Sequence, residues 1–192
     1  TNFGRLVKKY LGRTEISGGN GNGSLTLNGV YGDSGKVDLA SLGGRGHLNL
    51  SNVTVKDYSV LTKLYSFLGA KGRDSAKFKD AAFTIDITDG RIYFNRLVAY
   101  GAPLDLRLDG WHGFDGTLDY KLALKIYPPV STEMASYLGI SYPDLNLGPD
   151  NTLTLGVVAG GTTTDARFTI VSFNGAIAGV NTSISEALFA AK

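Results

Sequence analysis

Apolar and polar residues alternate along most of the chain, and this period of two is typical of β-strands with one buried face. Between residues 24 and 56 the alternating apolar positions are Leu25/Leu27, Val37/Leu39, Leu48/Leu50 and Val53/Val55. The same alternation returns over 83–94, 104–126 and 153–170. The pattern predicts a mainly β protein of the α+β class, whose residues 24–172 form one long antiparallel meander.

Other stretches follow a helical period. In "DYSVLTKLYSFLG" the apolar residues recur every three or four positions, which predicts one inserted helix over about 58–68, begun by Asp57 or Ser59 and ended at Gly69. "NFGRLVKKYL" predicts an amphipathic helix at the end of the sheet, and the "SGGNGNGS" that follows it reads as a flexible linker. Short helices are also expected near 132–138 and over 173–192. We expect a single domain, 1–192, with helix and linker over 1–23 and a helical tail over 173–192.

Two hairpins stand out in the strand region. Asp89-Gly90 is a favoured type I′ turn, which sets Ile87 opposite Ile92 and Ile85 opposite Phe94. For "DLRLDGWHGFDGTLDYKL" we expect a loop over 110–116 centred on Gly113. The predicted apolar pairs are Leu108–Leu118, Leu106–Tyr120 and Leu104–Leu122, and the predicted ion pairs are Arg107–Asp119 and Asp105–Lys121.

The second hairpin also holds the residues that most resemble an active site, namely Trp111, His112 and Asp115. Catalysis by His and Asp needs a nucleophile or a metal nearby. The chain has neither a G-x-S-x-G nor an H-E-x-x-H motif, and its other histidine, His47, is far away in sequence. We expect no catalytic residue, no metal site and no cofactor. Trp111 and Phe114 are expected to cover the end of the hairpin, with His112 in solvent.

The composition narrows the function classes. The chain has 192 residues, a formal net charge of +2 with scattered basic residues, and no Cys. This charge argues against a nucleic-acid partner, and the missing Cys excludes disulfides and thiolate chemistry. A chain that starts at Thr1 is expected to be a piece of a longer or processed protein.

Three segments together resemble the C-terminal region of AsmA-like proteins, which are relatives of the TamB and YhdP envelope proteins. The segments are "GRGHLNLSNVTVKDYSVLTKLYSFLG", "FTIDITDGRIYFNRLVAYGAPLDLRLDGW" and "FDGTLDYKLALKI". The resemblance is a diffuse pattern over 44–126, and "AGGTTTDARF" departs from it because a Pro that is frequent there in the family is missing. It implies a sheet curled into a groove or taco-like shape, a role in lipid transport and outer-membrane biogenesis, and a periplasmic location with a membrane anchor outside this chain.

On that basis we expect no enzyme but a groove that binds or conducts lipid acyl chains. Its partners would be a phospholipid or other acyl-chain ligand and membrane-associated envelope proteins. The expected lipid-binding residues are Leu48, Leu50, Phe83, Ile85, Ile87, Ile92, Phe94, Leu104, Leu106, Leu118, Leu122 and Leu124. Three alternatives stay open: a dry core filled by helices or a second sheet, a structural module that self-associates through its sheet edges into a homo-oligomer, and a carbohydrate-binding β-sandwich.

Overall fold

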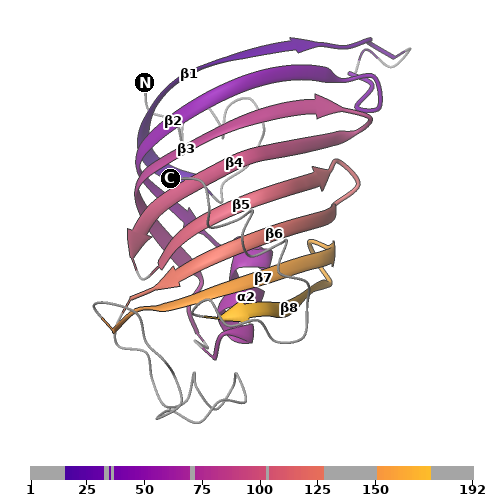
Figure 1. Ribbon diagram of the computed structural model, residues 1–192. Coiled ribbons are helices and arrows are strands. Elements are labelled where there is room, and N and C mark those ends of the chain that lie inside the picture. The colour runs from indigo at the N-terminus through magenta and orange to yellow at the C-terminus, as the bar shows by residue number, and fades with distance from the viewer. Residues whose placement is uncertain are drawn as a thin grey trace.

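A single antiparallel sheet dominates the computed structural model, which describes residues 16–32, 35, 37–69, 72–102, 104–127 and 151–173. Eight strands follow one another in space in the same order as in the chain, as Figure 1 shows. They are β1 (Ile16–Asn28), β2 (Gly43–Lys56), β3 (Ser75–Thr88), β4 (Arg91–Ala102), β5 (Leu104–Gly113), β6 (Thr117–Ile126), β7 (Leu153–Thr162) and β8 (Ala166–Phe173). The predicted mainly β meander is therefore confirmed. The helices expected at the termini and near 132–138 lie outside the described residues.

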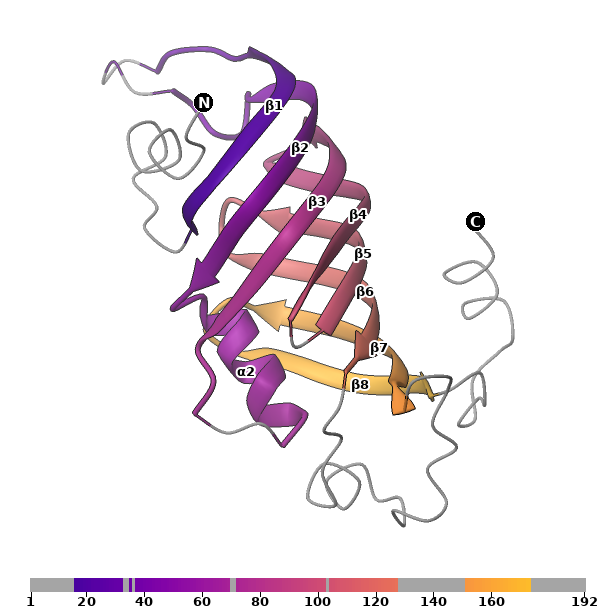
Figure 2. The same cartoon turned by 90° about the vertical axis from the view of Figure 1, so that its left-hand side faces the viewer.

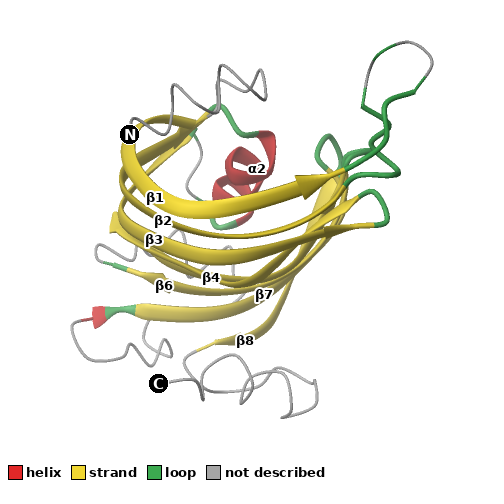
Figure 3. Cartoon of the chain, turned by 90° about the horizontal axis from the view of Figure 1, so that it is seen from above, coloured by secondary structure: helices red, strands yellow, loops and turns green. Residues whose placement is uncertain are grey.

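The helix α2 (Ser59–Phe67) is the inserted helix that the three-to-four period predicts. Its first helical residue is Ser59, but its N-cap is Tyr58, without a side-chain capping hydrogen bond, so neither Asp57 nor Ser59 caps the helix as expected. Gly69 follows its end with a φ of 77°, a conformation that suits glycine. The strands curve along their length, and α2 lies on the inner side of the curve, as Figure 3 shows. We call this side of the sheet the concave face.

β-Bulges allow the long strands to bend without turning their apolar side chains outward. In β2, β3 and β4 the apolar period steps once by three residues, between Leu50 and Val53, Phe78 and Ala81, and Phe94 and Leu97. The pairing of β3 with β4 is irregular at the steps in these two strands. Asn52, at the step in β2, and Arg96, at the step in β4, adopt a positive φ. Because a bulge adds one residue to a strand, both sides of each step keep their apolar residues on the concave face.

The β3–β4 hairpin has the predicted register. Ile87 lies opposite Ile92 and Ile85 opposite Phe94, with Asp89 and Gly90 in the turn.

The β5–β6 hairpin corrects the predicted register by four residues. Leu108 lies opposite Leu122, Leu106 opposite Leu124 and Leu104 opposite Ile126. The strands continue through Trp111 and His112, and the turn is confined to 114–116, where the Gly116 N–H donates to the Gly113 carbonyl at 2.9 Å. A shift by four keeps every side chain on its predicted face and still sets opposite charges across the strands, Asp105 against Lys125 and Asp109 against Lys121. The expected pairs of Arg107 with Asp119 and Asp105 with Lys121 are therefore wrong.

The glycine-rich stretch before Ser24 is also a correction, because it belongs to β1 and is no linker. Residues 17–23 pair with β2, for example Gly21 with Leu50 and Gly23 with Leu48. A Cβ at position 23 would collide with the backbone of His47, so the strands at this point approach too closely for any residue but glycine. The sheet therefore begins at Ile16 instead of Ser24.

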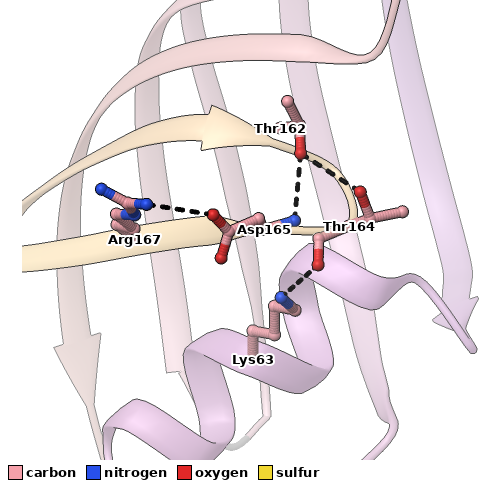
Figure 4. Close-up of polar contacts among 5 residues, drawn as sticks. All are labelled: Lys63, Thr162, Thr164, Asp165 and Arg167. Carbon is pink, nitrogen blue, oxygen red and sulfur yellow. Dashed lines mark hydrogen bonds and ion pairs between the residues drawn. The ribbon is translucent and has the colours of Figure 1, made fainter.

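The helix α2 packs on the β6–β8 part of the concave face. Its Leu64, Tyr65 and the following Leu68 are 1–6% exposed and join one cluster with the buried residues of β6 and β7. Polar contacts fix the same placement: Ser59 Oγ donates to the Thr163 carbonyl at 2.8 Å, and Lys63 Nζ donates to the Thr164 carbonyl at 2.5 Å. Figure 4 shows the lysine reaching the β7–β8 turn, and Figure 2 shows α2 beside β7 and β8, away from β1.

Candidate functional site

The concave face is apolar almost throughout. Directly paired residues lie on the same face of a sheet, so one row of side chains can be followed across the strands. A row near the β3–β4 turn runs Leu27, Gly44, Ile87, Ile92, His112, Leu118 and Gly161. The next row runs Leu25, Gly46, Ile85, Phe94, Gly110, Tyr120 and Ala159.

Part of the predicted lipid-binding set lies in a closed core. Leu104, Leu118, Leu122 and Leu124 are at most 3% exposed and belong to the cluster beneath α2, while Phe94 and Leu106 are partly buried against it. In this covered half the side chains of β5 to β8 and α2 pack against one another, which is the arrangement that the alternative of a dry core expects.

The remaining predicted residues lie outside that core cluster. They are Leu48, Leu50, Phe83, Ile85, Ile87 and Ile92, from β2, β3 and β4, of which Leu50, Ile85 and Ile87 are 7–8% exposed. Their row neighbours at the β1 edge are much more exposed, Leu25 at 48% and Leu27 at 51%. At the other end of β3 and β4, Ala76, Phe78 and Ala99 do belong to the cluster beneath α2. We therefore give the name uncovered half to the six residues together with Leu25 and Leu27, none of which is part of that cluster.

Glycine and leucine complement each other across β1 and β2. Leu25 and Leu27 of β1 face Gly46 and Gly44 of β2, while Leu48 of β2 faces Gly23 of β1. A Cβ at Gly44 would lie 2.7 Å from the Leu27 side chain and 3.6 Å from Ile87. The side chains of Leu25 and Leu27 therefore lie against Gly46 and Gly44, where any larger residue would meet them.

Among the described strand residues, the polar side chains on this face are those of His112 and Tyr120. His112 Nδ1 lies 2.9 Å from the Tyr120 hydroxyl, and the two rings stack with centroids 6.3 Å apart. Tyr58, which precedes α2, also hydrogen-bonds to Tyr120, and burial raises the pKa of the Tyr120 hydroxyl well above its usual value. The expectation that His112 lies in solvent is therefore wrong: it is half-buried on the concave face.

The other residues of the suspected active site serve the opposite face and the turn. Trp111 belongs to β5, where the Arg91 guanidinium lies 4.1 Å above its ring, so it does not cover the hairpin end as expected. The Asp115 carboxylate accepts hydrogen bonds from the Thr117 N–H at 2.9 Å and the Thr117 hydroxyl at 2.6 Å, and these bonds lower the pKa of Asp115. The geometry of Asp115 is that of a turn residue.

The two histidines lie on opposite faces of the sheet. His47 pairs with Thr84 on the convex face and hydrogen-bonds to Ser24 Oγ at 3.0 Å, whereas His112 lies on the concave face. The described residues contain no group of three or more His, Asp or Glu that is suited to a metal ion.

Compared with known proteins, the chain matches no family model, no curated protein and no solved structure. Among the described helices, none combines the length and the hydrophobicity that crossing a bilayer requires.

Three features of the face were missed at the level of sequence. Leu25 and Leu27 follow the strand period within the expected sheet but were not assigned to the lining. Gly44 and Gly46 carry a readable signal, since they alternate in phase with Leu48 and Leu50. The alternation of side chains along a strand also predicts the face of His112. His112 lies at an even position, like Leu104, Leu106 and Leu108, and therefore on the same face as these leucines.

Proposed function

We propose that this protein is a non-enzymatic domain of the AsmA-like type, which binds or conducts lipid acyl chains in the periplasm of a bacterial envelope. The observation that supports this most is the uncovered half of the concave face. Apolar residues exposed singly are ordinary on protein surfaces, but Leu25 and Leu27 continue a buried apolar row and end it at an open sheet edge. Each methylene group buried there would stabilise a bound chain by about 0.8 kcal/mol.

A direct test is native mass spectrometry of the delipidated protein mixed with dioleoyl phosphatidylethanolamine. We expect one lipid adduct on the wild type and its loss in Leu27→Arg, which places a charge where the chain would lie. The matched control is Tyr100→Arg. Tyr100 is 50% exposed, close to the 51% of Leu27, but it lies on the convex face. Equal lipid loading in the two variants, or no adduct on the wild type, would contradict the proposal.

The second candidate function is a structural module that assembles through its sheet edges. It is favoured by the exposed apolar residues that gather where β1 ends, Val30 at 64%, Tyr31 at 72% and Leu39 at 50%. Within the described residues, β1 pairs with β2 alone, so its other edge offers unpaired backbone groups to a neighbouring strand. Sedimentation velocity distinguishes the two functions: a concentration-dependent oligomer that Tyr31→Asp dissociates supports assembly, and a monomer at all concentrations excludes it.

A further inference from the structure

The outer edge of β1 lacks the features that usually keep an edge strand from pairing with another chain. Natural edge strands are commonly short, or carry charged residues or prolines. β1 is 13 residues long, and from residue 16 to residue 32 the chain has no charged residue and no proline. β8, at the other end of the sheet, has 8 residues and carries Arg167. Of the two outermost described strands, β1 is therefore the better suited to accept a further strand, and Figure 2 shows it at the end of the sheet.

The regular part of β1 runs from Asn20 to Asn28. Each residue in this range lies opposite a residue of β2 without a register shift, whereas Gly18 and Gly19 before it adopt a positive φ. Ser24 is the middle residue of the range. The side chains alternate between the two faces of the sheet, with Gly21, Gly23, Leu25 and Leu27 at concave positions and Asn20, Asn22, Ser24, Thr26 and Asn28 at convex positions.

This pattern is complementary to a reversed copy of itself. When two β1 strands pair antiparallel with Ser24 opposite Ser24, Leu25 lies opposite the second copy's Gly23. Leu27 then lies opposite the second copy's Gly21. Leucine against glycine is also the arrangement that joins β1 to β2 within one copy. Because the paired residues carry no charge, no like charges oppose each other in this pairing.

Other positions of a two-fold axis fit less well. An axis one residue to either side of Ser24 sets one end of the regular range opposite residues outside it, and so pairs only part of it. An axis between two residues sets concave positions opposite convex ones, although directly opposite residues share a face of a sheet. With the axis at Ser24 the whole range pairs, and polar positions meet polar positions, Asn20 with Asn28 and Asn22 with Thr26.

We propose that two copies of this chain join through β1 as an antiparallel dimer with its two-fold axis at Ser24. This inference rests on the second candidate function, assembly through sheet edges, and names the partner and the contact. The axis stands perpendicular to the sheet, so the two concave faces lie on the same side and their apolar rows continue from one copy into the other. Leu25 and Leu27, which are 48% and 51% exposed in one copy, gain a neighbour on their open side. The contact uses the same edge of both copies and therefore closes at two.

A cysteine on the axis tests the register, because the chain has no cysteine of its own and any disulfide must join two copies. The full chain with Ser24→Cys is oxidised mildly and separated by non-reducing electrophoresis. We expect a disulfide-linked dimer, since the two Cβ atoms lie about 4.5–5.5 Å apart across the axis. In Thr26→Cys the two cysteines lie four residues apart along the ladder, or roughly 13 Å, so the cross-link should be lost. Thr169→Cys, at an exposed convex position of β8, measures linkage by random collision.

A pair of charge variants tests the same contact without oxidation. In Ser24→Lys or Ser24→Glu alone, like charges face each other across the axis, so each variant should dimerise about fivefold more weakly than the wild type. An equal mixture of the two should regain the wild-type affinity, because opposite charges then meet. Sedimentation velocity measures the association, and circular dichroism verifies the fold of each variant.

The outcomes separate the contact from the function on which it rests. A concentration-dependent wild-type dimer that cross-links through Ser24→Cys supports the proposal. An oligomer larger than two, or a dimer that cross-links no better through Ser24→Cys than through Thr26→Cys or Thr169→Cys, would overturn the β1 contact while assembly through sheet edges stands. A monomer at all concentrations would show that the second candidate function itself is wrong. The lipid adduct in native mass spectrometry tests acyl-chain binding separately.

Discussion

The ammonium group of Lys63 on α2 donates a hydrogen bond of 2.5 Å to the backbone carbonyl of Thr164, 101 residues further along the chain. Thr164 lies in the β7–β8 turn, which is itself joined to the β5–β6 turn by the hydrogen bond from the Thr163 N–H to the Gly116 carbonyl. The β5–β6 turn is joined in the same way to the β3–β4 turn, through Phe114 and Gly90. The contact therefore ties the helix to a row of three turns and holds it over the β6–β8 part of the face.

We expect Lys63→Met to lower the free energy of unfolding by about 1 kcal/mol, because it removes one hydrogen bond but leaves the alkyl stem of the side chain. Urea denaturation followed by circular dichroism measures the change. Lys79→Met, at an exposed lysine of β3, is the control and should change stability by less than about 0.5 kcal/mol. Equal effects of the two substitutions would show that the contact does not hold the helix.

The division of the concave face into two halves predicts opposite responses to loss of a leucine. Leu155 is 0% exposed beneath the helix, so Leu155→Ala should destabilise the protein by about 2–5 kcal/mol. Leu27 is 51% exposed, so Leu27→Ser should change stability by less than about 1 kcal/mol while weakening the binding of an acyl chain. Urea denaturation and the lipid adduct in native mass spectrometry give the two readouts. A large destabilisation by Leu27→Ser would mean that this half is also structural core.

The glycines of β2 predict a steric effect. A Cβ at Gly44 would lie 2.6 Å from the Thr26 carbonyl oxygen and 2.7 Å from the Leu27 side chain, so Gly44→Ala should force β1 and β2 apart and cost about 1–3 kcal/mol. Gly160 of β7 is the matched control, because its Cβ would meet no atom closer than 4.0 Å, and Gly160→Ala should be tolerated. Hydrogen exchange of the β1 amides should accelerate in the first variant and stay unchanged in the second.

The sequence determines a hairpin register well when its turn has one favoured type. Asp89-Gly90 admits a single two-residue turn that keeps apolar residues together, and the predicted pairs of β3 and β4 are the observed ones. The β5–β6 hairpin contains several glycines and leucines at every second position. Registers of this hairpin that differ by an even number of residues keep each side chain on the same face of the sheet. The predicted and the observed register both set opposite charges across the strands, so charge pairing alone does not distinguish them. The turn from Asp115 to Thr117, with its two hydrogen bonds, decides the register.

Whether an apolar residue lies in a core or on an open surface depends on where α2 is placed, and that contact joins segments about a hundred residues apart. Strand parity shows that Ile87 and Leu124 share a face, but it does not say which of them the helix covers. The bulges were readable, since the apolar period steps by three in β2, β3 and β4. The glycine-rich part of β1 was not, because the lack of side chains resembles a linker until the pairing with β2 is known.

The turn at Asp115 predicts a dependence of stability on pH. Its hydrogen bonds from Thr117 lower the pKa of the carboxyl below the usual 3.8. A lowered folded-state pKa contributes stability that is present above the unfolded value and is lost as the pH falls through the folded value. Asp115→Ala should therefore reduce the urea midpoint at pH 7, and the gap to the wild type should narrow below about pH 4. A gap that stays constant down to pH 2 would show that the charge has no part in the turn.

Two buried tyrosines predict opposite effects of the same substitution. The Tyr65 hydroxyl of α2 is buried and has no hydrogen-bond partner in the described structure, and burial raises its pKa. Tyr65→Phe removes an unsatisfied polar group and should stabilise the protein by about 1 kcal/mol. Tyr120→Phe removes the hydroxyl that bonds with His112 and Tyr58 and should destabilise the protein by about 1 kcal/mol, because these hydrogen bonds on an apolar face are lost. Thermal and urea denaturation measure both changes. Destabilisation by Tyr65→Phe would reveal a partner for that hydroxyl, and an unchanged stability in Tyr120→Phe would mean that the histidine–tyrosine pair contributes nothing to the free energy of folding.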